Sequence, residues 1–185
     1  RRHPYFATSV GNHDHDDRLD DLSPAARGDD VKRARTLLAD LPTKVDAAKL
    51  SRAGQIDLEI WTHALNYQLW QAEHADRFVS DPRVYGEYTT DSVFLLFTQS
   101  TLPRERNVAN AAGRIGFVPK IVAAAKASLK NPPRVLTEVA IKRNRGAIAF
   151  YEKDVFQLSG ETASTSPLAG PCKEAVAALK DFQTF

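Results

Sequence analysis

Two imidazoles and three carboxylates stand side by side near the start of the chain, in the run His13-Asp14-His15-Asp16-Asp17. Imidazole nitrogens and carboxylate oxygens together suit zinc, manganese or iron. Catalytic metal sites, however, usually draw their ligands from separate elements that neighbouring side chains hold in place. The run therefore leaves three interpretations open: a metal site, the lining of a polar pocket, or a solvated or capping loop.

Other reactive side chains have no partner that the sequence reveals. His63 and His74 fall on one face of a predicted helix, but their spacing places them roughly 16 Å apart along its axis, too far to share a metal. Neither belongs to an HExxH zinc motif, and the sequence contains no GxSxG, Walker or GxGxxG motif. We expect both histidines to be structural residues at the edge of the core. Cys172, beside Pro171 at a helix start, is expected to have a somewhat lowered pKa.

The elements that must position these groups are helices. Apolar residues recur at intervals of three and four, and no polar and apolar alternation is long enough to predict a strand. The helices are predicted at residues 24–41, 51–79, 90–97, 108–115, 118–129, 136–151 and 173–185. We therefore predict an all-α fold, an irregular multi-helix domain built around antiparallel helix hairpins, with no significant sheet.

The stretch 102–156 is predicted to organise this fold. Lys130-Asn131-Pro132-Pro133 reads as a tight corner between two helices, because consecutive prolines prevent a helix from continuing. Gly146 interrupts the second helix at a cost of roughly 1 kcal/mol against alanine, which indicates a close helix contact there. The helix at 51–79 carries two apolar stripes and is predicted to be central. Residues 84–88 read as an irregular connector.

Composition limits the classes of function. The 185 residues carry 25 basic and 23 acidic side chains, a net charge of +2 that does not favour nucleic acid. No apolar run is long enough to span a membrane. Lys142, Arg143 and Arg145 form a local basic excess, which we interpret as a solvated helix face, with an anion site as the alternative.

The chain is predicted to be a single helical domain over residues 1–185 and the N-terminal part of a longer protein. It contains no methionine, and the helix at 173–185 keeps its apolar stripe to the last residue without a capping signal. That stripe consists of Val176, Leu179, Phe182 and Phe185. If a further part of the protein exists, we expect this stripe to be exposed in the isolated chain.

Three groups of segments together resemble the N-terminal half of the bacterial proteins known as domain of unknown function 885. They are Ala7–His13 with Asp16–Leu19 and Leu22–Pro24; Asp81-Pro82 with Tyr85; and Leu129–Val135 with Thr137-Glu138 and Phe150-Tyr151.

The resemblance implies a mostly helical protein of the gluzincin metallopeptidase type. Its zinc would be bound by an HExxH motif and a Pro-Gly-His element, both in a C-terminal half that this chain lacks. The chain would then be an inactive scaffold that forms one wall of a peptide cleft, and its partner would be the remaining C-terminal portion or a second chain. Family members often carry export or lipoprotein signals, which implies the cell envelope or periplasm.

The resemblance also implies site residues. Gly11, His13, Asp17 and Arg18 match the family motif and are expected to line the cleft, whereas His15 stands where the motif usually has tyrosine. No catalytic residue, metal ligand or cofactor is expected within this chain. The alternative hypothesis is a self-contained helical module that binds a partner without catalysis.

Overall fold

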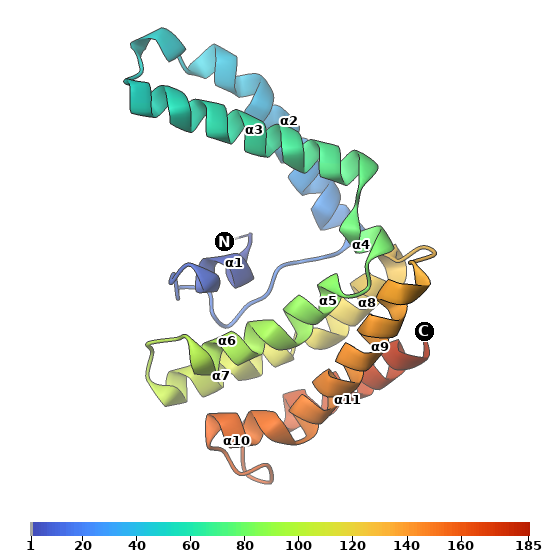
Figure 1. Ribbon diagram of the computed structural model, residues 1–185. Helices are drawn as coiled ribbons and strands as arrows, with labels where there is room; N and C mark the ends of the chain where they lie inside the picture. The colour runs from blue at the N-terminus through green and yellow to red at the C-terminus, as the bar shows by residue number, and fades with distance from the viewer. Residues whose placement is uncertain (1) are drawn as a thin grey trace. The chain divides into compact units, whose positions relative to one another are not determined.

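The computed structural model describes residues 2–185, and within them it contains helices and no strand (Figure 1). The all-α prediction is therefore confirmed. The helices form two compact units: one combines the N-terminal segment through Ser23 with Phe78–Phe185, and the other is Pro24–Arg77. Whether the chain is a single domain stays a prediction, because two compact units can belong to one domain.

The smaller unit is a helix hairpin. It consists of α2 (Pro24–Lys44), the short turn η1 (Ala47–Lys49) and α3 (Arg52–His74). Ser51 caps α3, since its hydroxyl accepts a hydrogen bond of 3.2 Å from the Gly54 N–H. Arg27 and Asp76 close the other end of the hairpin through an ion pair of 2.7 Å.

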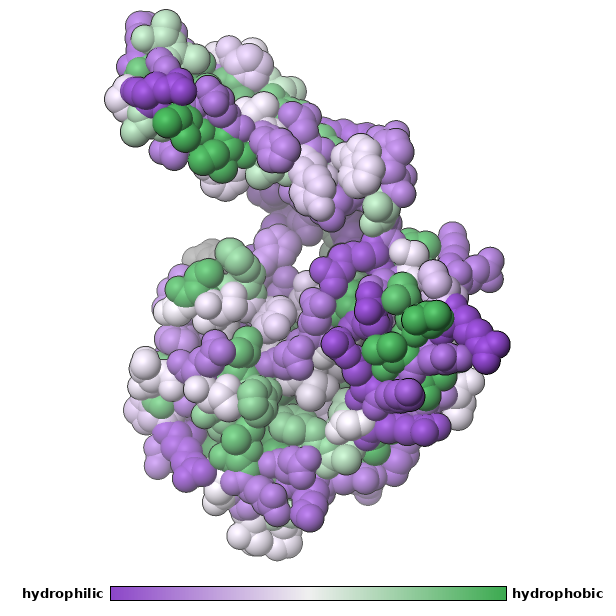
Figure 2. Space-filling model, in the orientation of Figure 1, coloured by the Kyte–Doolittle hydropathy of each residue, from purple (hydrophilic) through white to green (hydrophobic). Residues whose placement is uncertain are grey.

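The prediction that the second of these helices is central is wrong. In α3 the one buried residue is Leu65, whereas Ile60, Tyr67 and Trp70 are 59%, 53% and 52% exposed. His63 and His74 are exposed as well, not at the edge of a core. The helix packs against α2 through one stripe and leaves its second stripe uncovered, and Figure 2 shows apolar surface over it.

The larger unit holds the main core. Its elements are α1 (Pro4–Ser9), α4 (Arg77–Ser80), α5 (Val84–Gly86), η2 (Glu87–Asp91), α6 (Ser92–Thr98), α7 (Arg104–Ile115), α8 (Val118–Ser128), α9 (Arg134–Ala149), η3 (Phe150–Asp154), α10 (Val155–Ser159) and α11 (Ala169–Thr184). Residues 84–98 form one helical run in which η2 is a π-helical turn, so the predicted irregular connector at 84–88 is wrong.

Helix α11 packs against α7, α8, α9 and η3, and thus joins the helices of the core. In α8, Val118, Val122 and Ala125 are buried at 0–3% exposure, and Leu129, just past the end of the helix, is half-buried. In α11 Leu179 is buried, and Phe182 packs against the core. The apolar stripe of this helix is therefore packed within the chain except at Phe185, which is 61% exposed, so the helix gives little support to the prediction of a longer protein.

The predicted corner is present between α8 and α9. Asn131 adopts a left-handed conformation with φ of 45°, which asparagine tolerates better than most residues. The predicted close contact at Gly146 is wrong, because a Cβ added there would meet no atom within 4 Å. The close contact lies at Gly113 of α7, where a Cβ would lie 2.6 Å from the Asp17 backbone oxygen.

Candidate functional site

The N-terminal motif folds as a loop around a buried carboxylate. Gly11 has φ of 85°, a conformation that glycine adopts readily, and it turns the chain after α1. His13 Nδ1 then lies 2.8 Å from Asp16 Oδ2, and the Thr8 hydroxyl donates to Asp16 Oδ1 over 2.5 Å. Asp16 is 1% exposed and is therefore the centre of the loop.

Arg114 of α7 compensates this buried charge. Its guanidinium is fully buried and lies 3.5 Å from Asp16 Oδ1. It also donates to the Ser92 backbone oxygen over 2.7 Å, to the Arg18 backbone oxygen over 3.1 Å, and to the Thr8 hydroxyl. Burial lowers the pKa of Arg114, and the carboxylates of Asp16 and Asp20 oppose that shift. A buried pair persists when its remaining donors and acceptors are satisfied in this way.

The four motif residues that were expected to line a cleft, Gly11, His13, Asp17 and Arg18, differ in their exposure. Asp17 and Arg18 point outward, with side chains 54% and 64% exposed and a long ion pair of 3.6 Å between them. Gly11 is exposed, while His13 is held against Asp16. That these four residues line a cleft stays a prediction. Sequence reasoning missed Arg114, whose partners lie far away in the chain.

The loop does not assemble as a metal site. Within residues 2–185 no group of three or more His, Cys, Asp or Glu side chains is placed to hold a metal ion. His13 and Asp16 point at each other, and Asp16 is occupied by Thr8 and Arg114. The geometry favours the loop interpretation of the run at 13–17, but the loop is fixed by hydrogen bonds and an ion pair to Asp16 rather than solvated throughout.

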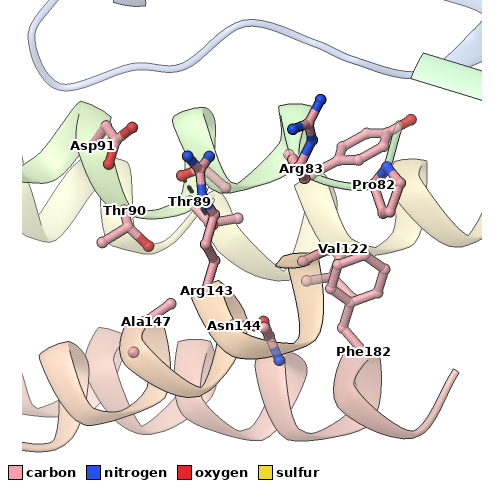
Figure 3. A pocket seen from close by; sticks show the side chains of 14 residues that line it. Pro82, Arg83, Thr89, Thr90, Asp91, Val122, Arg143, Asn144, Ala147 and Phe182 are labelled. Carbon is pink, nitrogen blue, oxygen red and sulfur yellow. Dashed lines mark hydrogen bonds between the residues drawn. The ribbon is translucent and has the colours of Figure 1, made fainter. Parts of the chain in front are cut away.

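A cavity of about 340 Å³ lies between η2 and α9 (Figure 3). Part of its wall is apolar and comes from Tyr85, Val122, Ala147 and Phe182. Gly146 lines it too, and the lack of a side chain there leaves space open. Pockets that bind small molecules are commonly of this size and mostly apolar, with a few polar groups that orient the ligand.

Polar groups gather at one end of this cavity. Thr90 and Asp91 come from η2, and Arg143 reaches toward them from α9 (Figure 3). Among the described residues neither Asp91 nor Arg143 has a hydrogen bond or a close ion pair, and the buried Thr90 hydroxyl oxygen has no partner. Loss of hydration at the cavity wall and the nearby Glu87 raise the pKa of Asp91, while Arg143 acts in the opposite direction.

A second cavity, of about 450 Å³, adjoins the first along α9. The two share Pro82, Ala140, Asn144 and Phe182 in their walls. The second is lined further by residues of the predicted corner and of the end of α11: Leu129, Asn131, Pro132, Gln183, Thr184 and Phe185. We call the two together the α9 groove. It has a polar end at Asp91 and a largely apolar end at Phe185.

Two features singled out in the sequence belong to this groove: the corner between α8 and α9, and the basic residue Arg143. The corner residues Asn131 and Pro132 belong to a segment that carried the family resemblance. Arg143 was assigned to a solvated helix face with an anion site as the alternative, and it does line the polar end. Sequence reasoning did not connect Asp91 with Arg143; Asp91 lies at the end of the π-helical turn η2, in a different helix. π-Helical turns occur frequently at functional sites.

The fold is thus an all-helical scaffold with a groove along one helix. Comparisons with known proteins show which family the chain belongs to. Residues 4–185 match the family described as bacterial protein of unknown function (DUF885), and the chain belongs to that family. The resemblance found in the sequence is confirmed to that extent. No curated protein matches the chain.

One solved structure shares the fold. It is described as a "putative lipoprotein of unknown function" from Shewanella oneidensis, and it matches with a TM-score of 0.83 at 18% identity. The match covers 98% of this chain and 33% of the other, so the chain spans about a third of that protein's length. In the described part of the chain, no helix is both long and apolar enough to cross a membrane.

Proposed function

We propose that this chain is the helical scaffold of a larger, zinc-dependent peptidase-like protein of the bacterial cell envelope, and that the α9 groove forms one wall of its peptide cleft. The observation that carries the proposal is the groove, whose two adjoining cavities follow one helix and suit an extended ligand. The peptidase class is only what the resemblance of the sequence segments implies, because the matching family is described as of unknown function. The lipoprotein description of the structural neighbour supports the envelope.

The proposal assigns the zinc ion to the remainder of the protein. The side chains described here do not offer a metal a set of three ligands, so no chemical step is assigned to a metal in this chain. The role of this chain is to bind and orient a substrate. The buried pair of Arg114 and Asp16 would serve that role by fixing the N-terminal loop to α7.

A second surface supports a partner for this chain. Along α3 the rings of His63, Tyr67, Trp70 and His74 follow each other with centroids 5.6–6.5 Å apart and planes within 8–12° of parallel. We call this row, with Ile56 and Ile60, the α3 aromatic row. Exposed apolar patches on proteins commonly mark interfaces. We propose the remainder of the larger protein as its occupant, since the structural neighbour is about three times as long.

The alternative is a self-contained interaction module, which the α3 aromatic row also favours. The first hypothesis requires zinc binding and peptide cleavage by the full-length protein, whereas the second requires neither. We would purify the full-length protein and residues 1–185, measure zinc by mass spectrometry, and assay cleavage of fluorescence-quenched peptides. The proposal expects zinc and cleavage in the full-length protein and neither in the isolated chain. The proposal would be overturned if the full-length protein lacked either zinc or peptide cleavage. It would also be overturned if the isolated chain bound zinc or cleaved peptides.

The partner surface has its own test. Changing Tyr67 and Trp70 to serine should leave the isolated chain folded, because both side chains are exposed, and should destabilise the full-length protein. Changing the exposed Gln68 to serine is the matched control. If the isolated chain is a dimer that the double variant dissociates, the occupant is a second copy and the assignment to the remainder of the protein is wrong.

A further inference from the structure

The polar end of the α9 groove presents one cation and one anion, both at exposed residues and neither with a hydrogen bond or ion pair to another described residue. Arg143 and Asp91 are close enough for the charge of Arg143 to act on Asp91, yet they form no ion pair. Opposite charges that line one cavity without pairing leave room for a ligand between them. The unpartnered Thr90 hydroxyl at the same wall would gain a hydrogen bond from such a ligand.

The rest of this cavity has both polar and apolar walls, since Arg83, Thr89 and Asn144 line it together with apolar side chains. Val122 and Ala147 are buried side chains of its wall, and the Phe182 ring lies beside Val122, whereas Ala147 lies nearer to Thr90 (Figure 3). A ligand that suits the cavity therefore needs a carboxylate and an ammonium at one end and a short apolar group at the other. Arginine binds carboxylates through its planar donors, and a carboxylate such as Asp91 accepts from an ammonium.

We propose that the polar end of the α9 groove binds a free α-amino acid with an apolar side chain. Its carboxylate lies at Arg143, its ammonium at Asp91, and its side chain against Ala147 and Val122. The site belongs to this chain alone and requires neither zinc nor peptidase activity, so it can be tested apart from the function proposed above.

Calorimetric titration of the chain with L-leucine, N-acetyl-L-leucine and L-leucinamide tests the charge requirement. L-Leucine should bind, and removal of either charge should weaken binding by about tenfold or more, as expected for the loss of a charge-assisted hydrogen bond. The dipeptide Leu-Leu separates the two charges and should bind more weakly than leucine. Equal binding of the capped forms, tighter binding of Leu-Leu, or no binding at about 1 mM leucine would refute the proposal.

Two variants assign the charges to their residues. Arg143→Gln should no longer distinguish leucine from leucinamide, and Asp91→Asn should no longer distinguish leucine from N-acetyl-leucine. Lys142→Gln and Asp154→Asn remove exposed charges from α9 and η3 outside the cavity lining and should behave as wild type. If the two variants still bound leucine more tightly than leucinamide and N-acetyl-leucine, Arg143 and Asp91 would not be the residues that bind its charges.

Discussion

At the scale of residues, the chain depends on a few buried polar groups. Arg114 and Asp16 are both fully enclosed, and their charges are tolerated because each also has hydrogen-bond partners. Asp16 is thus the most buried side chain of the N-terminal motif, and it lies in the sequence between His13 and Asp17, which were expected to line a cleft. The exposed members of the motif, Asp17 and Arg18, keep their backbone oxygens against α7.

Removing Arg114 should be severely destabilising. Arg114→Leu leaves Asp16 buried without its cation, and the loss of one partner of a buried ion pair costs about 3–5 kcal/mol in the free energy of unfolding. Urea denaturation followed by circular dichroism measures the change. Arg18→Leu, at an exposed arginine, should change stability by less than about 0.5 kcal/mol. Similar losses in the two variants would contradict a structural role for the buried pair.

The thiol of Cys172 should be inert in the folded chain. The sequence suggested a lowered pKa, but Cys172 lies within α11 at 3% exposure, and burial raises its pKa to about 12. The nucleophilic thiolate is therefore scarce at pH 8. A thiol reagent such as DTNB should react with the cysteine only after denaturant is added. Rapid reaction in the native state would show that α11 opens readily.

Leucine binding should weaken in acid. The carboxylate form of Asp91 holds the ammonium, and its pKa is raised above 3.8 chiefly by lost hydration, with Glu87 acting in the same direction and Arg143 against it. Affinity should thus be full near neutral pH and fall as pH decreases through that raised pKa. Calorimetry from pH 7 down to pH 4 measures this. Asp91→Asn should show a flatter profile, and an unchanged wild-type profile would exclude Asp91.

At the scale of elements, periodicity predicted the helices of the core but not their neighbours. The stripe at Val118, Val122 and Ala125 is buried as expected, and the two prolines end α8 as expected. The second stripe of α3 has the same spacing and stays exposed, because periodicity shows that a face is apolar but not what covers it. The π-helical turn η2 was equally invisible, since it depends on tertiary packing.

Two glycines should respond oppositely to alanine. Gly113→Ala places a Cβ against the Asp17 backbone oxygen and should destabilise the chain by about 1–3 kcal/mol. Gly146→Ala enters open space within α9 and should stabilise it by about 0.5–1 kcal/mol through helix propensity. Thermal denaturation measures both. A stabilising Gly113→Ala would show that the loop can move away from α7.

At the scale of the whole molecule, the two units differ in how much side-chain surface they bury. The larger unit contains both clusters of buried apolar residues, whereas the α2–α3 hairpin buries only Ala34 and Leu65 among its described helical residues. The all-α class could be predicted because it depends on local spacing. The groove could not, because its polar walls come from helices far apart in the chain.

The hairpin should exchange its amide hydrogens faster than the core. Few buried contacts mean a low free energy of local opening. Hydrogen exchange with mass spectrometry on residues 1–185 should show early exchange in α2 and α3 and late exchange in α8 and α11. In the full-length protein α3 should become protected if its aromatic row is covered. Equal protection of hairpin and core in the isolated chain would contradict this expectation.

The contact between Arg114 and Thr8 joins residues 106 positions apart. A ribosome releases the amino end first, so the carboxylate of Asp16 emerges in water long before its cation is synthesised. The loop that holds Asp16 can therefore reach its native conformation only after Arg114 has been synthesised. During that interval the nascent loop stays open to proteases and chaperones, and the emergence of α7 closes it.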